Sequence, residues 1–154
     1  MTRLVSMLAA GAAMTTAAMA DNVVASDAAA LAAKITSFGY TAELSKDSTG
    51  DPQITVTSGG ATFNIFFYGC TGGTACKFVQ FNKCWDREGT FPLETANRWN
   101  RTKTFGTASV DEEGDPCFDM TVNFSGGGVA SDNLSDDLQR WDRAMGAWRE
   151  MMGP

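Results

Sequence analysis

Apolar positions along the chain recur with two different periods, and the changes of period mark the expected elements. Three stretches, at about 27–38, 90–103 and from 131 onwards, carry apolar residues at the three- and four-residue spacing of a helix. The last stretch has the clearest apolar stripe, made up of Leu134, Leu138, Trp141, Met145 and Trp148. Residues able to cap a helix mark the three expected starts: Ser26, Thr90 and Ser131.

Between the first two expected helices, and again before the third, apolar and polar residues alternate as they do in half-buried strands. The expected strands span about 40–44, 53–58, 61–70, 76–85, 105–111 and 116–124. Polar or glycine-containing turns separate them, including the two-residue turn Gly59-Gly60 and the acidic turn Asp111–Asp115. We therefore expect an α+β fold, in which three helices pack on an antiparallel sheet of about five or six strands.

The beginning of the chain follows neither pattern. Arg3 precedes an apolar run over residues 4–18, and the small-x-small sequence Ala18-Met19-Ala20 stands directly before Asp21. This order is typical of a cleavable secretory signal peptide. We predict that residues 1–20 are removed, that residues 21–154 form a single domain, and that this domain is periplasmic or secreted, with no membrane contact after processing.

Charge and composition narrow the possible partners and chemistry. The chain has 12 basic and 18 acidic residues, so its net charge is −6, and it becomes −7 if Arg3 is removed with the leader. Nucleic acids and anionic lipids require a basic surface, so we expect neither as a partner. There is no histidine, the commonest general base and metal ligand. We expect no catalytic residue, no bound metal and no cofactor.

The register of the central hairpin predicts how the four cysteines pair. The central hairpin consists of the expected strands 61–70 and 76–85. If these strands pair so that the numbers of facing residues sum to 146, Cys70 lies opposite Cys76. Cys84 and Cys117 then remain to pair with each other. The same register places Cys70, Cys76 and Cys84 on the face away from the core. Four cysteines allow three connectivities, and we favour the structural disulfides Cys70–Cys76 and Cys84–Cys117. The spacings do not match a Cys-x-x-Cys redox motif or a zinc site.

Three other residues are candidates for structural roles. Trp99 lies on the apolar side of the second expected helix, so we expect it to pack in the core. Asn100 is the polar residue on the same side, and we expect it to satisfy backbone groups rather than to touch a ligand. Gly114 lies in the acidic turn, where we expect a positive φ angle.

Short motifs follow one another in a fixed order over residues 27–152. They are Gly69-Cys70, Lys77–Phe81, Trp99-Asn100, Phe105-Gly106, Asp111–Pro116, Asp119-Met120, Gly127–Val129 and Asn133-Leu134. This order and spacing resemble those of the YbjN-domain family, which is described as sensory transduction regulators of bacteria. The resemblance implies an α+β fold like that of the type III secretion chaperones. It implies no enzymatic activity and carries no established site residue.

These expectations combine into one leading function and one alternative. The leading interpretation is a non-catalytic, exported binding or chaperone-like module that acts in envelope stress or signalling. By analogy of fold, its partner would be a protein or peptide bound at an apolar groove or a sheet edge. The alternative is a periplasmic thiol-redox protein or enzyme that uses Cys70 and Cys76.

Overall fold

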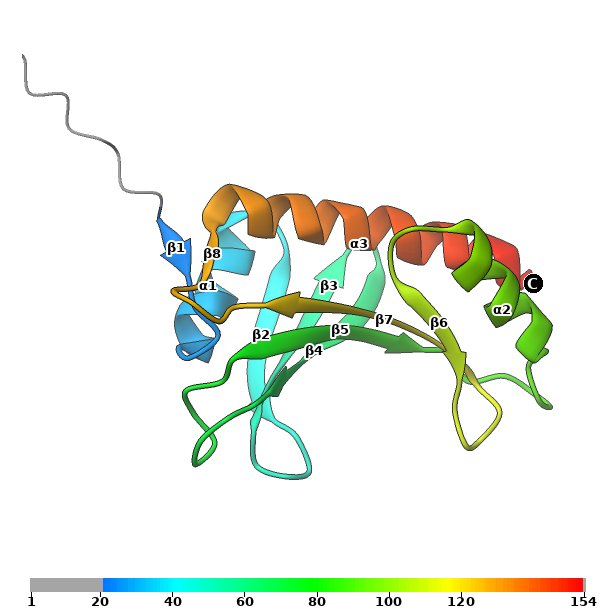
Figure 1. The fold of residues 1–154 in the computed structure, drawn as a ribbon, viewed down its shortest axis with the longest axis horizontal. Coiled ribbons are helices and arrows are strands. Elements are labelled where there is room, and N and C mark those ends of the chain that lie inside the picture. The colour runs from blue at the N-terminus through cyan, green and yellow to red at the C-terminus, as the bar shows by residue number, and fades with distance from the viewer. Residues whose placement is uncertain (1–20, 154) are drawn as a thin grey trace, which may run out of the picture.

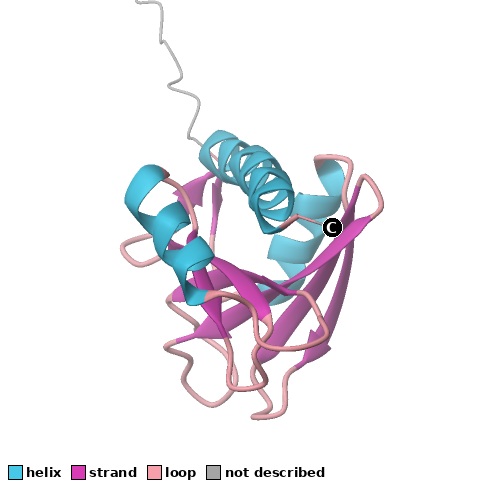
Figure 2. Ribbon diagram, turned by 90° about the vertical axis from the view of Figure 1, so that its right-hand side faces the viewer, coloured by secondary structure: helices cyan, strands magenta, loops and turns pink. Residues whose placement is uncertain are grey.

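Three helices and a strongly curved sheet make up the part of the chain that the computed structural model describes, residues 21–153 (Figure 1). The predicted leader, residues 1–20, lies outside the described residues. The main sheet has six antiparallel strands in the order β2-β3-β4-β5-β7-β6. Figure 2 shows the helices gathered on one face of this sheet. The α+β class expected from the sequence is thus confirmed.

The six strands of the main sheet correspond to the six predicted from the alternating pattern. They are β2 (Thr41–Lys46), β3 (Pro52–Ser58), β4 (Ala61–Tyr68), β5 (Phe78–Cys84), β6 (Thr107–Val110) and β7 (Pro116–Asn123). In the central hairpin, Ile65 pairs with Phe81 and Asn64 with Asn82, which is the predicted register. The strand pattern therefore fixes which residues face the helices.

A second, two-stranded sheet joins the beginning of the described chain to the segment before the last helix, and it was not predicted. Here β1 (Asn22–Val23) pairs with β8 (Val129–Ala130). Strands of two residues are too short to show a periodic pattern. Gly128 precedes β8 with a φ of 88°, and a side chain there would collide with the backbone of Val23. The glycine run before the last helix therefore allows two backbone segments to approach closely.

The three expected helices form, but their caps differ from the predicted ones. The helices are α1 (Ala28–Ser37), α2 (Leu93–Thr102) and α3 (Ser131–Met152). Their N-caps are Asp27, Pro92 and Ala130 rather than Ser26, Thr90 and Ser131.

Two of the three differences have a local cause. The Asp27 carboxylate accepts a hydrogen bond from Ala30 N at 2.9 Å, so Asp27 takes the capping role one residue after Ser26. Phe91 N donates to Gly114 O at 2.9 Å, which keeps the chain after Thr90 extended until Pro92. Ser131 is already the first helical residue.

Helix α3 lies along the inner face of the sheet, where aromatic rings form the centre of the core. All five residues of its predicted stripe are buried. The Trp141 ring contacts the rings of Phe63, Phe81 and Phe118, with centroids 5.3, 5.7 and 5.3 Å away. The outer face carries polar side chains from β4, β5 and β7, including Asn64, Gln80, Asn82 and Asp119. The sheet is therefore apolar on its inner face and mostly polar on its outer face, where Tyr68 and Phe78 form an exposed, stacked aromatic pair.

Candidate functional site

A groove runs along α3, and its opposite wall is the end of α2 with the loop that follows. Two side chains of α2 hold this loop in place. Trp99 Nε1 donates to Gly106 O at 3.2 Å. The Asn100 amide both donates to Ala108 O and accepts from Ala108 N, each at 2.9 Å. These bonds fasten the loop and strand β6 to α2, so the groove has a rigid wall.

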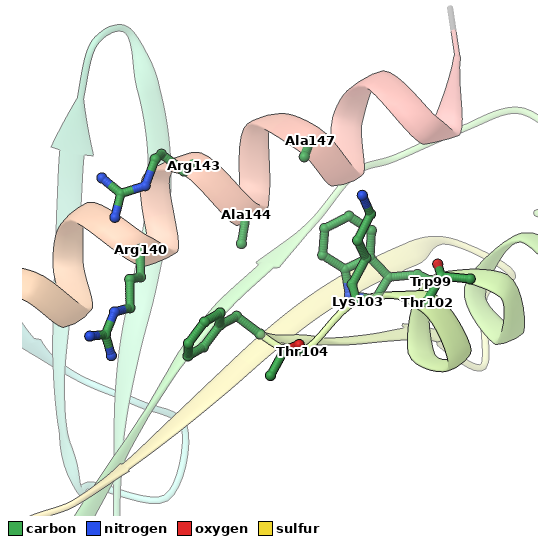
Figure 3. Close-up of a pocket in the computed structure, with 9 residues that line it drawn as sticks. Trp99, Thr102, Lys103, Thr104, Arg140, Arg143, Ala144 and Ala147 are labelled. Atoms are coloured by element: carbon green, nitrogen blue, oxygen red, sulfur yellow. The ribbon is translucent and has the colours of Figure 1, made fainter.

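The groove encloses about 420 Å³ and has an apolar floor with basic side chains around it. From α3 come Ala144 and Ala147, whose short side chains leave room beside Trp99 (Figure 3). Phe105 forms part of the opposite wall and is 47% exposed although it is a large apolar residue. The lining of the groove also includes Thr102, Thr104 and three basic residues, Lys103, Arg140 and Arg143. Within residues 21–153, no acidic residue lines the groove.

The basic residues lie against aromatic rings, where a cation is attracted to the ring face. The Arg140 guanidinium is 5.2 Å from the Phe105 centroid, and Lys103 Nζ is 5.8 Å from the Trp99 centroid. Arg140 also lies 4.0 Å from Asp136 and 3.7 Å from Asp137 on its own helix. Among the described residues, no carboxylate lies within ion-pair distance of Lys103 or Arg143. The groove therefore concentrates positive charge that is only partly neutralised.

From the lining of this groove, the sequence singled out Trp99, and it did so as a core residue; the groove itself was not predicted. Trp99 is 2% exposed, as expected, and Asn100 satisfies backbone groups, as expected, although its own side chain is exposed. Arg140, Arg143, Ala144 and Ala147 were not singled out. Their three- and four-residue spacing places them on one face of α3 beside the apolar stripe, and this pattern of basic and small residues is the signal that could have found them.

A second pocket, of about 620 Å³, lies on the other side of α3 next to the Gly59-Gly60 turn. Here Asp142 Oδ2 accepts hydrogen bonds from Tyr40 OH and Ser58 Oγ, each at 3.0 Å. Burial and the neighbouring Asp142 carboxylate raise the pKa of Tyr40 to about 12, so its hydroxyl stays protonated and keeps donating. The other carboxylate oxygen, Oδ1, is buried and has no hydrogen-bond partner in the described chain. This arrangement ties α3 to β3 and to the residue directly before β2.

The four cysteines form the two disulfides that the register favoured, Cys70–Cys76 and Cys84–Cys117. One expectation about them is wrong, because Cys76 is 5% exposed and belongs to the core cluster rather than to the outer face. Strand pairing ends at Tyr68 and Phe78, so the alternation of faces does not continue into the loop. A buried disulfide packed on the core has the environment of a structural bridge rather than of a reactive one.

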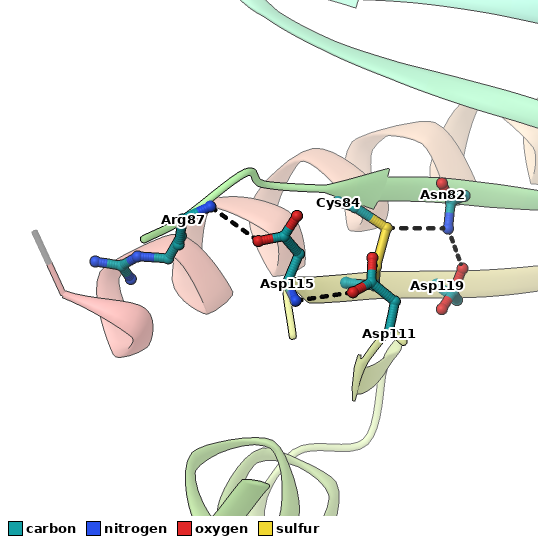
Figure 4. The surroundings of a disulfide bond; sticks show 7 residues. Asn82, Cys84, Arg87, Asp111, Asp115 and Asp119 are labelled. Atoms are coloured by element: carbon teal, nitrogen blue, oxygen red, sulfur yellow. Dashed lines mark hydrogen bonds between the residues drawn. A yellow bond between two sulfur atoms is a disulfide. The ribbon is translucent and has the colours of Figure 1, made fainter. Parts of the chain in front are cut away.

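The Cys84–Cys117 disulfide joins β5 to β7 across the outer face (Figure 4). Asp111 Oδ2 lies 3.6 Å from Cys117 Sγ, so Asp111 and these two cysteines are close enough to resemble a metal-binding group. Metal ligation by cysteine requires thiolates, however, and both sulfurs are used in the covalent bond. Asp111 also accepts from Asp115 N at 2.8 Å. The group therefore does not fit a metal ion while the disulfide is intact.

Beside this disulfide, a carboxylate sits on the outer face with one close partner. Asn82 Nδ2 donates to Asp119 Oδ1 at 2.7 Å. Partial burial raises the pKa of the Asp119 carboxyl, and the Asn82 hydrogen bond offsets part of this rise. Nearby, the Tyr68 hydroxyl donates to Gln80 at 3.1 Å, and burial with the charges of Asp119 and Asp47 raises the pKa of that phenol.

Gly114 lies in the turn between β6 and β7, where it has a φ of 93° and is buried. A side chain at this position would lie 3.2 Å from Thr90 Cα. The turn therefore needs glycine both for its backbone angle and for its close approach to the segment before α2. The predicted positive φ is observed.

Comparison with known proteins places this fold in one family. The family model of YbjN, described as "Putative bacterial sensory transduction regulator", matches residues 27–153, and the chain belongs to this family. The family is described by regulation and not by an enzymatic reaction. No curated protein and no solved structure matches the chain. Within residues 21–153, none of the helices combines the length and the apolar character needed to cross a membrane.

Proposed function

We propose that this protein is an exported, non-catalytic binding module, and that the groove between α2 and α3 holds an acidic, amphipathic segment of a partner protein. The observation that carries the proposal is the combination of three basic side chains with an apolar floor in one groove. A chaperone-like activity would be one use of such binding, since holding a partner segment requires no reaction at the site.

Charge complementarity supports an acidic ligand. The protein is acidic overall, with 18 acidic and 12 basic residues, yet the groove is lined by Lys103, Arg140 and Arg143 and by no acidic residue. An acidic segment would be attracted to this region and repelled by much of the remaining surface. The exposed Phe105 ring and the space beside Ala144 and Ala147 provide a place for apolar side chains of the same segment.

Two observations favour a module that works outside the cytoplasm. The sequence of residues 1–20 has the layout of a cleavable export signal. All four cysteines pair in disulfides, which persist in oxidising compartments and are rare in the cytosol. In the envelope, binding of a partner segment would be the molecular event behind the sensory role that the family description suggests.

Peptide binding tests the groove. The probe is a fluorescein-labelled helical peptide built from leucine and glutamate, and its control is the same peptide with glutamine in place of glutamate. We expect tighter binding of the glutamate peptide, weakened by about tenfold or more in the variant Lys103→Glu, Arg143→Glu. The variant Arg98→Glu, Arg101→Glu reverses two charges on α2 outside the groove and is the matched control. Equal binding of both peptides would contradict the proposal.

Photo-crosslinking in the producing cell identifies the natural partner. Benzoylphenylalanine replaces Phe105 in the groove or, as a control, Leu93, which is 63% exposed on α2 but does not line the groove. We expect a crosslinked protein at position 105 only, with its crosslinked peptide rich in aspartate or glutamate. Identical products at both positions would show that the groove is not the binding site.

The mass of the intact protein from the same cells tests export. We expect a chain that begins at Asp21, with no cysteine modified by a thiol-alkylating reagent before reduction. A chain that retains Met1, or one with four free thiols, would contradict export and leave the groove proposal to be tested in the cytoplasm.

A further inference from the structure

The two edges of the six-stranded sheet differ in how their backbone groups are satisfied. At one edge, the Asn100 amide occupies both the N–H and the C=O of Ala108 in β6. At the other edge, β2 pairs with β3 on one side only, and no residue of the described part bonds to the outer backbone groups of Thr41–Lys46. An open row of N–H and C=O groups is a template for pairing with another strand.

The outward-facing residues of β2 can be identified from the turn that follows it. Asp47 N donates to Asp51 O at 2.9 Å, so these residues face each other as a hydrogen-bonded pair. Hydrogen-bonded and non-hydrogen-bonded pairs alternate along an antiparallel ladder. In the register of β2 with β3, the backbone groups that point away from the sheet therefore belong to Ala42, Leu44 and Lys46.

We propose that β2 pairs antiparallel with β2 of a second copy of this chain, so that two six-stranded sheets join across a two-fold axis at Leu44. In this register Leu44 faces Leu44 of the second copy, and Ala42 faces Lys46 on each side of the axis. All three outward-facing residues of both copies then take part in backbone hydrogen bonds. Any shifted antiparallel register leaves at least one of them unpaired.

Side chains select the same register. With Leu44 on the axis, Glu43 faces Ser45 of the second copy. A shift in one direction would place Glu43 opposite Glu43, and a shift in the other direction would place it opposite Asp47, which is unfavourable for like charges. Leu44 lies on the inner face opposite Ile54 and is 47% exposed. Pairing it with a second leucine removes apolar surface from water and extends the core across the joint.

The closed edge limits the assembly to two copies. Pairing between identical β2 strands is self-complementary and uses both free edges at once. Each remaining edge is β6, whose outward groups on Ala108 are already occupied by Asn100. The joined sheet therefore ends in two protected edges, and open-ended growth is prevented.

The experiment combines oligomeric state with crosslinking by single cysteines, since all four native cysteines are in disulfides. The protein is followed by analytical ultracentrifugation from micromolar to the highest workable concentration, and a dimer is expected. Leu44→Lys places like charges at the axis and should raise the dissociation constant of the dimer by about tenfold or more. Leu93→Lys makes the same change at another exposed leucine, on α2, and should leave the dissociation constant unchanged.

Crosslinking then tests the register. We expect Leu44→Cys to form a disulfide-linked dimer on mild oxidation, because the two introduced thiols face each other. Thr41→Cys lies on the same strand, three residues from the axis, so its two copies are about 20 Å apart and should remain unlinked. A monomer at every concentration, a dimer insensitive to Leu44→Lys, or equal crosslinking at positions 41 and 44 would each overturn the proposal.

Discussion

On the inner face of the sheet, aromatic rings exclude water around Trp141, whereas the outer face is held by a covalent bond and by pairs of polar side chains. The inner face gains its stability from buried area, which does not depend on redox conditions. The outer face remains in contact with solvent, where burial contributes little. There the Cys84–Cys117 disulfide stabilises the fold instead, so the stability of this face depends on oxidising conditions.

The largest predicted effect breaks the inner face. Trp141 is fully buried and contacts three aromatic rings, so Trp141→Ala should lower the free energy of unfolding by about 3–5 kcal/mol. Trp141→Phe should cost much less, because it keeps the ring contacts and removes an indole N–H that has no hydrogen-bond partner among residues 21–153. Denaturant unfolding measures both variants, and equal losses would contradict this account of the core.

The second prediction breaks the outer face. The paired change Cys84→Ser, Cys117→Ser should lower the free energy of unfolding by about 2–5 kcal/mol, because the disulfide closes a long loop. Cys70→Ser, Cys76→Ser opens a much shorter loop and should cost only about 2 kcal/mol. Thermal unfolding of both variants beside the parent decides the order. A larger loss from the short loop would show that packing of Cys76, rather than loop closure, dominates.

A third, smaller effect concerns the turn between β6 and β7, at the end of the sheet where its inner and outer faces meet. Gly114→Ala should cost about 1–2 kcal/mol, because alanine is disfavoured at a φ of 93°. Gly146→Ala is the contrasting control, since Gly146 is helical and an added side chain there meets no atom within 4 Å. That change should stabilise the protein by up to about 1 kcal/mol. Losses at both positions would mean that the turn has no special requirement.

The smallest predicted effect depends on pH. Burial raises the pKa of Asp119, so the folded state holds this proton more tightly than the unfolded state does. Ionisation of Asp119 therefore lowers stability as the pH rises above its ordinary value and through its raised folded value. Asp119→Asn should raise the melting temperature slightly at pH 7, and the gain should disappear in strong acid, where the carboxyl is neutral in both states. A gain that is constant with pH would point to a different cause.

Local patterns predicted most of the fold, because half-buried strands and helices each require apolar residues at a characteristic spacing. The six main strands, the register of Ile65 with Phe81 and the stripe on α3 follow from alternation and helical spacing. The helix caps were misplaced, since several nearby side chains can cap a helix and tertiary contacts choose among them. Strands β1 and β8 were missed because two residues have no period.

The candidate groove was harder to predict because its walls come from distant parts of the chain. Lys103 and Phe105 follow α2, whereas Arg143 and Ala144 belong to α3. No local pattern reveals that these segments face each other. The same holds for Asp142, whose partners Tyr40 and Ser58 lie 102 and 84 residues away in the sequence. Only the packing angle of α3 on the curved sheet brings such groups together.

The order of the cysteines has a consequence for how the protein matures. Among the four cysteines, the first pairs with the second and the third with the fourth, Cys70 with Cys76 and Cys84 with Cys117. A chain that crosses a membrane amino end first presents its thiols in this same order. An oxidase that joins each newly arrived pair would therefore produce the native connectivity directly. If the protein is exported, as proposed, its maturation in the envelope would require an electron acceptor but no enzyme that reshuffles incorrect bridges.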